Sequence, residues 1–154
     1  MKVKGITGVI AIILCFFIAS CTQNNGNIGK YFGSWVLRSV TVNGSEQSLL
    51  PEGAKYGTMS FQGSVVRFLT VYSSDRASEN YATWTEADNE IHFDFNNSNH
   101  ETPAGTSIYA PPVWLGFGPL NVSVKVTRLD NSHLDFERTD AEGHLWKYAF
   151  ERTW

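Results

Sequence analysis

The sequence predicts an all-β domain, an eight-stranded antiparallel up-and-down barrel over residues 31–154. Three observations lead to this fold class. Apolar and polar residues alternate with period two in several runs, most regularly in 120–129 and 90–95, which is typical of strands with one buried face. No window after residue 30 keeps a helical period, and short turns alternate with long loops between the runs. A two-sheet β-sandwich is the alternative architecture.

Eight runs of residues have the pattern of strands. The first, 35–42, changes phase between Leu37 and Val40, which predicts a β-bulge. Clean alternation marks the last strand, where Trp146, Tyr148 and Phe150 are the apolar positions. The predicted strands are 35–42, 57–62, 65–71, 80–85, 90–95, 120–129, 133–138 and 145–152, with a possible short ninth strand near 106–110.

The connections divide the predicted barrel into two unlike ends. Antiparallel neighbours place alternate connections at opposite ends. One end receives short turns rich in Gly, Asp, Asn and Ser, as tight hairpins require: Gly63-Ser64, 86–89 and 130–132. The other end receives longer segments: 43–56, 72–79, 96–119 and 139–144. A barrel of eight strands either fills its interior with side chains or holds one small ligand.

Length, charge and cysteine content limit the function classes. The chain has 154 residues, of which 42% are hydrophobic and 18% charged, and this fits a single globular domain. A net charge of −3 disfavours a nucleic-acid surface. Two cysteines cannot build the disulfide framework of a small secreted domain.

The N-terminus has the features of an export signal. Lys2 and Lys4 precede an apolar stretch over 6–19, which is shorter than the roughly 20 residues that a membrane span requires and is typical of a signal peptide. Ile18-Ala19-Ser20-Cys21 resembles the lipobox of bacterial lipoproteins. That resemblance implies cleavage by signal peptidase II before Cys21 and acylation of Cys21, which would anchor the chain in a membrane.

This reading divides the chain into three parts: a signal peptide at 1–20, the lipidated Cys21 with a flexible tether at 21–30, and the barrel domain at 31–154. Cleavage would remove Cys15, so the mature domain would have no free thiol, and the net charge would fall to −5 with Lys2 and Lys4 gone. Thr22, rather than Asp, follows the cysteine. By similarity to enterobacterial sorting this favours the outer membrane, with the periplasmic or the surface face left open.

The start of the first strand carries a family resemblance. Gly33-Ser34-Trp35 resembles the Gly-x-Trp motif of lipocalins, and the opening 33–37 with the closing 148–152 is similar to small lipocalin-like lipoproteins of Bacteroidetes. The resemblance implies an eight-stranded barrel in which Trp35 packs across the closed end under Arg152, a cation–π contact. Gly33, Trp35 and Arg152 are therefore the expected structural motif of that end. The disulfide cysteines of lipocalins are absent.

No pattern in the chain indicates catalysis, a metal or a cofactor. The histidines lie far apart and lack a second ligand at metal spacing, so we expect surface positions for His92, His100, His133 and His144. The 140–143 segment reads as a turn, because it lacks the alternating carboxylates of a calcium loop. Asp135 and Glu137 share one strand face, as exposed strand residues commonly do. We expect a protein that is not an enzyme.

The long 96–119 connection is the unusual segment. It contains four prolines, and its aromatic residues include Tyr109, Trp114 and Phe117. Leaving these rings in water would be unfavourable, because burying each contributes roughly 1.5–3 kcal/mol. The segment is therefore either a lid over a ligand pocket at the barrel mouth or a plug that fills the barrel.

The first functional hypothesis is that the barrel binds a small apolar or amphiphilic ligand. Strand phase places Arg138 at the loop-rich mouth, pointing inward. It either pairs with Glu52, Glu101 or Asp140 or receives a carboxylate or phosphate head. The expected ligand-binding residues are Phe95, Tyr109, Trp114, Phe117, Arg138 and Trp146, with the ligand tail between Phe95, Trp114, Phe117 and Trp146. The alternative is a protein-interaction module, an enzyme inhibitor or an accessory subunit of an outer-membrane complex, that uses the loop-rich end.

Overall fold

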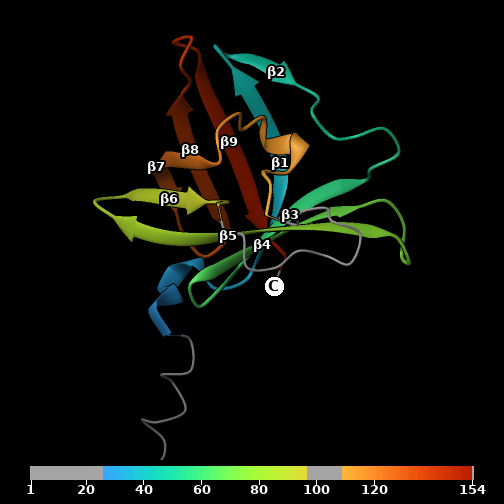
Figure 1. The fold of residues 1–154 in the computed structure, drawn as a ribbon, viewed down its shortest axis with the longest axis horizontal. Helices are drawn as coiled ribbons and strands as arrows, with labels where there is room; N and C mark the ends of the chain where they lie inside the picture. The colour runs from blue at the N-terminus through green and yellow to red at the C-terminus, as the bar shows by residue number, and fades with distance from the viewer. Residues whose placement is uncertain (1–25, 97–108, 154) are drawn as a thin grey trace, which may run out of the picture.

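The chain forms one closed antiparallel β-barrel, seen in a computed structural model that describes residues 26–96 and 109–153 (Figure 1). Eight strands follow one another around the barrel. Strand β1 pairs with both β3 and β9, so the sheet closes on itself. The predicted eight-stranded up-and-down barrel is confirmed. The eight strands are β1 (Ser34–Val42), β3 (Tyr56–Gln62), β4 (Val65–Val71), β5 (Ala77–Ala87), β6 (Glu90–Asp94), β7 (Asn121–Leu129), β8 (His133–Thr139) and β9 (Leu145–Arg152).

Strand β1 contains the predicted irregularity. Its register against β9 shifts between Leu37 and Ser39, which confirms the bulge. Without that extra residue the alternation would turn Val40 away from the interior, because a one-residue shift moves every side chain to the other face. Val40 is instead buried.

A ninth strand, β2 (Ser45–Gln47), forms a hairpin with β1 where the sequence analysis expects only a loop. Asn43 and Gly44 form its turn with positive φ angles of 51° and 83°. Asn-Gly is the preferred pair for such a turn, so a signal for this hairpin is present in the sequence. The short strand expected near 106–110 falls mostly outside the described residues, and 109–110 are not in a strand.

The two ends of the barrel differ as predicted. The closed end carries the tight β3–β4, β5–β6 and β7–β8 turns and the 3-10 helix η1 (Gly26–Tyr31) (Figure 1). Tyr31 seals this end, with its ring 5.2 Å from that of Phe61 and 5.4 Å from that of Trp84. The opposite, loop-rich end carries the longer connections. Among the described residues, no helix is long and apolar enough to cross a membrane.

Aromatic rings fill the barrel from the closed end upward. Phe93, near the middle, lies 5.8 Å from Phe68 and 6.4 Å from Phe136 between ring centroids. Such edge and tilted contacts stabilise a core beyond the burial of apolar area. The largest fully buried side chains are Trp35, Trp114, Tyr148, Phe61, Phe68, Phe93, Phe95, Phe136 and Phe150. The interior is therefore a packed core up to the mouth.

Candidate functional site

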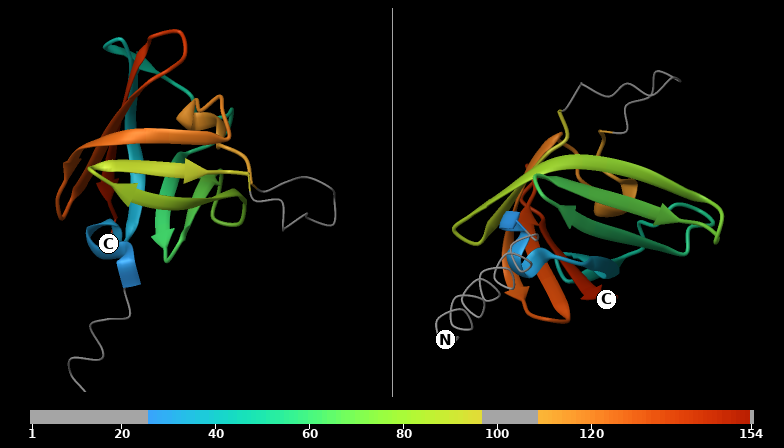
Figure 2. Two further views of the ribbon diagram at one scale, coloured as in Figure 1. Left: turned by 60° about the vertical axis from the view of Figure 1, so that its left-hand side comes forward. Right: turned by 90° about the horizontal axis from the view of Figure 1, so that it is seen from below.

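Segment 111–119, here called the plug, occupies the mouth of the barrel and contains the 3-10 helix η2 (Val113–Leu115) (Figure 2). Trp114 and Leu115 are fully buried. The indole Nε1 of Trp114 donates a hydrogen bond to Thr70 Oγ1 at 2.9 Å, and the Trp114 ring lies 6.1 Å from that of Phe68. Of the two interpretations that the sequence leaves open, the structure supports a plug.

Two glycines allow the plug to sit this deeply. A Cβ atom on Gly57 would lie 2.6 Å from the indole of Trp114, and one on Gly116 would lie 2.6 Å from the ring of Trp146. Gly116 also ends η2 with a φ of 59°, a conformation that favours glycine. Sequence reasoning missed Gly57, because its neighbour Trp114 lies far away in the chain.

Arg138, on β8, points into the mouth as strand phase predicts. Its Nε donates to the hydroxyl of Tyr148 at 3.1 Å, and a terminal nitrogen donates to the carbonyl oxygen of Gly116 at 2.7 Å. The guanidinium carbon lies 4.7 Å from the ring centroid of Trp146 and 5.2 Å from that of Phe117. The cation is thus held by neutral oxygens and aromatic faces.

Tyr148, on β9, links Arg138 to the plug. Its hydroxyl donates to the carbonyl oxygen of Leu115 at 2.7 Å while it accepts the bond from Arg138. Burial raises the pKa of Tyr148 to about 12, and the guanidinium offsets only part of that effect. A protonated Tyr148 therefore serves as both donor and acceptor, and Arg138, Tyr148 and the plug carbonyls form one network.

A hollow of about 600 Å³ lies beside Arg138, between the plug, the start of β7 and the 139–142 segment. Asp140 also lines it, and its carboxylate accepts a bond from the indole Nε1 of Trp146 at 2.7 Å and one from the backbone nitrogen of His144 at 2.8 Å. These donors, the indole foremost, lower the pKa of Asp140 to about 2. The hollow therefore offers a cation from Arg138 and a carboxylate already occupied by local donors.

Asp140, Glu142 and His144 could present three ligand atoms within 4.8 Å of one another. However, the Asp140 oxygens already accept hydrogen bonds from the backbone nitrogens of Glu142 and His144 and from the indole of Trp146. This is the pattern of an Asx-type turn, as the 140–143 segment suggests in sequence, and we assign no metal to it.

Five of the six expected ligand-binding residues meet at the mouth, namely Phe95, Trp114, Phe117, Arg138 and Trp146. In this structure no open space for a ligand tail lies between the four aromatic members, because the side chains themselves occupy it. Phe95 stacks on Phe68 at 5.6 Å, and Phe117 packs on Tyr148 at 5.8 Å.

Tyr109 lies away from the other five. Its ring is 6.3 Å from that of Tyr81. Tyr81 alternates on β5 with the buried Ala82 and so faces outward, which places Tyr109 on the outer wall.

Two of the three carboxylates expected as partners of Arg138, Asp140 and Glu52, form no ion pair with it in the part of the chain that the structure describes. Asp140 bonds Trp146 instead. Glu101 lies outside the described residues, as do His100 and the predicted lipidation site Cys21.

At the closed end, Arg152 lies over Trp35, with its guanidinium carbon 4.4 Å from the ring centroid. The Trp35 indole donates to the carbonyl of Tyr31 at 2.8 Å, and Arg152 donates to the carbonyl of Lys30 at 2.7 Å. Gly33, just before β1, has a φ of 129°. The contact that the resemblance implies is therefore present, and it also holds η1 against the barrel.

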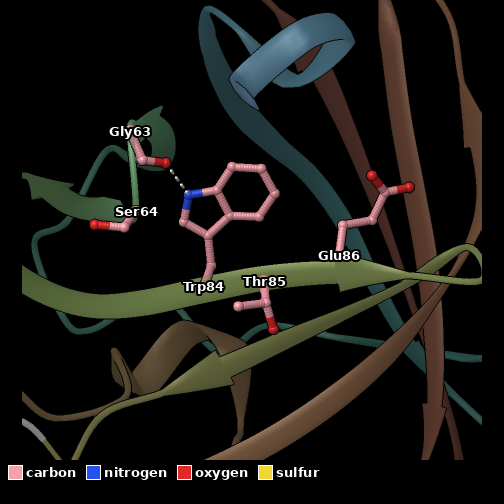
Figure 3. A pocket seen from close by; sticks show the side chains of 5 residues that line it. All are labelled: Gly63, Ser64, Trp84, Thr85 and Glu86. Carbon is pink, nitrogen blue, oxygen red and sulfur yellow. Dashed lines mark hydrogen bonds between the residues drawn. The ribbon is translucent and has the colours of Figure 1, made fainter. Parts of the chain in front are cut away.

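A second hollow, of about 530 Å³, lies at the closed end beside Trp84 (Figure 3). The Trp84 indole donates to the carbonyl of Gly63 at 2.9 Å, and Glu86 extends away from Ser64. A nucleophile needs an adjacent base to become reactive, and Ser64 and Glu86 are not arranged in that way.

No protein-family model matches the chain, and no curated protein is similar to it in sequence. Solved structures with a similar fold include two from Bacteroides. A lipocalin-like protein from Bacteroides uniformis ATCC 8492 is 18% identical with a TM-score of 0.54, over 80% of this chain and 99% of that one. An uncharacterized protein from Bacteroides eggerthii DSM 20697 is 21% identical with a TM-score of 0.52, over 79% and 98%. The chain therefore has a lipocalin-like barrel fold.

Proposed function

We propose that the protein is a lipid-anchored, non-catalytic lipoprotein of the outer membrane that binds an anionic amphiphile at its loop-rich end. The lipocalin-like barrel supports ligand binding, since a barrel of eight strands can hold one small ligand. The anchor is supported by the lipobox-like residues that end at Cys21. Phe117, Arg138 and Trp146 would contact the ligand first.

The observation that carries the ligand proposal is the environment of Arg138. Its guanidinium is half-buried beside the hollow, and among the described residues it has no carboxylate partner. A half-buried cation gains most from an anionic partner, and the planar guanidinium binds carboxylate and phosphate bidentately. An anionic head in the hollow would supply this missing charge.

Binding of the head would also loosen the plug. One terminal nitrogen of Arg138 donates to the carbonyl of Gly116, so a head that binds the guanidinium bidentately competes with that carbonyl. Releasing Trp114 exposes a large aromatic side chain, at a cost of roughly 1.5–3 kcal/mol. A tail that replaces it recovers about 0.8 kcal/mol per buried methylene. The proposed ligand therefore needs a chain of several methylenes as well as an anionic head.

The test is a titration of delipidated protein with fatty acids and lysophospholipids, followed by tryptophan emission. We expect a saturable change, because Trp114 and Trp146 both lie at the mouth, and weaker binding in Arg138→Ala. Arg38→Ala is the matched control, since Arg38 pairs with Glu151 on the outer wall. Absence of any saturable change, with the fold intact, contradicts the ligand proposal.

A second candidate function is a protein-interaction module, an inhibitor or an accessory subunit, that uses the same end. The filled interior favours it, as does the distribution of exposed apolar side chains. Tyr56, Val113, Leu120 and Leu145 are exposed at the loop-rich end, by 41%, 71%, 43% and 36%. If this candidate is right, crosslinking recovers a specific envelope protein, and Val113→Asp abolishes that recovery whereas Arg138→Ala does not. Amphiphiles then leave the tryptophan emission unchanged.

A further inference from the structure

Among the described residues of the closed end, Phe32 is the one exposed aromatic side chain. Phe32 follows η1 and is 43% exposed, whereas the other large exposed apolar residues of the described chain lie at the loop-rich end. A hollow of about 500 Å³ adjoins it, lined by Gly29, Lys30, Phe32, Leu129, Asp130, Asn131 and Arg152. Segments that lie at a membrane interface commonly combine Phe, Trp or Leu side chains with Lys or Arg.

The charges around Phe32 favour a lipid headgroup. Asp130, the carboxylate of this hollow, is bonded to Arg128 at 2.8 Å and to the backbone nitrogens of Ser132 and His133. These bonds, that from Ser132 foremost, hold its pKa well below its usual range. Its charge is therefore compensated locally. The ammonium of Lys30, which forms no ion pair in the described part of the chain, remains available to a phosphate.

The length of the tether brings this end to the membrane. The barrel structure begins at Gly26, and only residues 22–25 separate Gly26 from Cys21. The five residue steps from Cys21 to Gly26 span about 18 Å at most when the chain is fully extended. The headgroup layer is itself several ångströms thick, so a lipid on Cys21 would keep the closed end within reach of the bilayer surface.

We propose that the closed end docks on the membrane, with Phe32 inserted at the interface and Lys30 on a lipid phosphate. This inference rests on the proposed anchor at Cys21. The ring of Phe32 then leaves water at little further entropic cost, because the anchor already confines the barrel. The loop-rich mouth points away from the membrane, toward its ligand or partner.

Spin labels at two matched positions test the docking. After signal cleavage and acylation the native chain would offer no free thiol, since its two cysteines are Cys15 and Cys21. Phe32→Cys and Tyr56→Cys therefore each accept one nitroxide in the full-length lipoprotein. The two side chains are 43% and 41% exposed and lie at opposite ends, so either substitution spares the core, and circular dichroism confirms the fold.

The labelled proteins are reconstituted in vesicles of phosphatidylethanolamine and phosphatidylglycerol, and power saturation is measured with oxygen and with a water-soluble nickel chelate. Docking predicts a several-fold rise in the ratio of oxygen to nickel accessibility at position 32 and no change at position 56. If the protein floats with the vesicles but the accessibility ratio is equal at both positions, the docking is wrong and the anchor is not affected. A protein that neither floats nor carries palmitate overturns the anchor, and the docking falls with it.

Discussion

A substitution at Gly57 tests whether the plug fills the mouth in the way described. A Cβ atom at this position would lie 2.6, 2.7 and 3.0 Å from three indole carbons of Trp114. Carbon atoms pack best at about 3.5–4.0 Å, so the indole of Gly57→Ala must move by roughly 1 Å. That movement breaks the 2.9 Å bond from the indole to Thr70.

The expected cost of Gly57→Ala is about 1–3 kcal/mol. Overpacking a tight core typically costs that much, and a buried donor left without its acceptor costs about 1–3 kcal/mol. The measurement is urea denaturation of the unlipidated chain, and the emission of Trp114 should shift to longer wavelength. The same substitution is then measured in the Trp114→Ala variant, which lacks the clashing ring.

The two substitutions must interact if the contact is real. In the Trp114→Ala background a methyl group at position 57 meets empty space, so Gly57→Ala should cost little there or stabilise the fold. Residues in contact typically show coupling energies of 0.5–3 kcal/mol. Equal costs of Gly57→Ala in both backgrounds would falsify the placement of Trp114 over Gly57.

Three further outcomes follow from the same structure. Trp35→Ala should lower the free energy of unfolding by about 3–5 kcal/mol, and Arg152→Ala should lower it by less. If the shifts in denaturation midpoint simply add in the double mutant, the two side chains do not stack. The pKa of Asp140 is lowered in the folded protein from 3.8 to about 2, so the ionised carboxylate stabilises the fold above pH 3.8 and this stabilisation is lost as the pH falls through 2. An acid titration followed by the emission of Trp146 checks this expectation. The Trp146→Phe variant should lack the transition. Cys21→Ala should abolish palmitate labelling and cleavage by signal peptidase II, and a mutant that is still labelled would refute the anchor.

The sequence predicted the parts of the fold that depend on local pattern. Period-two alternation and turn composition are properties of adjacent residues, so the eight strands and the two unlike ends could be read directly. The bulge near Leu37 followed from a phase change within one strand. The short β2 strand was missed although Asn43-Gly44 carries a known turn signal, because its three residues show no alternation of their own.

The mouth could not be predicted to the same depth. Whether a 24-residue aromatic-rich connection covers a pocket or fills it depends on how much volume the barrel wall leaves free. That volume depends on contacts between distant residues, such as Gly57 with Trp114 and Gly116 with Trp146. Strand phase predicted that Arg138 points inward. Its hydrogen-bond partners could not be predicted, because backbone and hydroxyl oxygens leave no charge pattern in a sequence.

Arg138 could bind a ligand as well as stabilise the closed mouth, because its contacts come from two different elements. Two of them come from β9, the hydroxyl of Tyr148 and the ring of Trp146, and two come from the plug, the carbonyl of Gly116 and the ring of Phe117. If the plug withdraws, the β9 contacts still orient the guanidinium, and the nitrogen that held Gly116 becomes free. An anion then meets a donor that is already in position, which lowers the ordering cost of binding. In the proposed function, exchange of the Gly116 carbonyl for an anionic head would therefore require little rearrangement of Arg138.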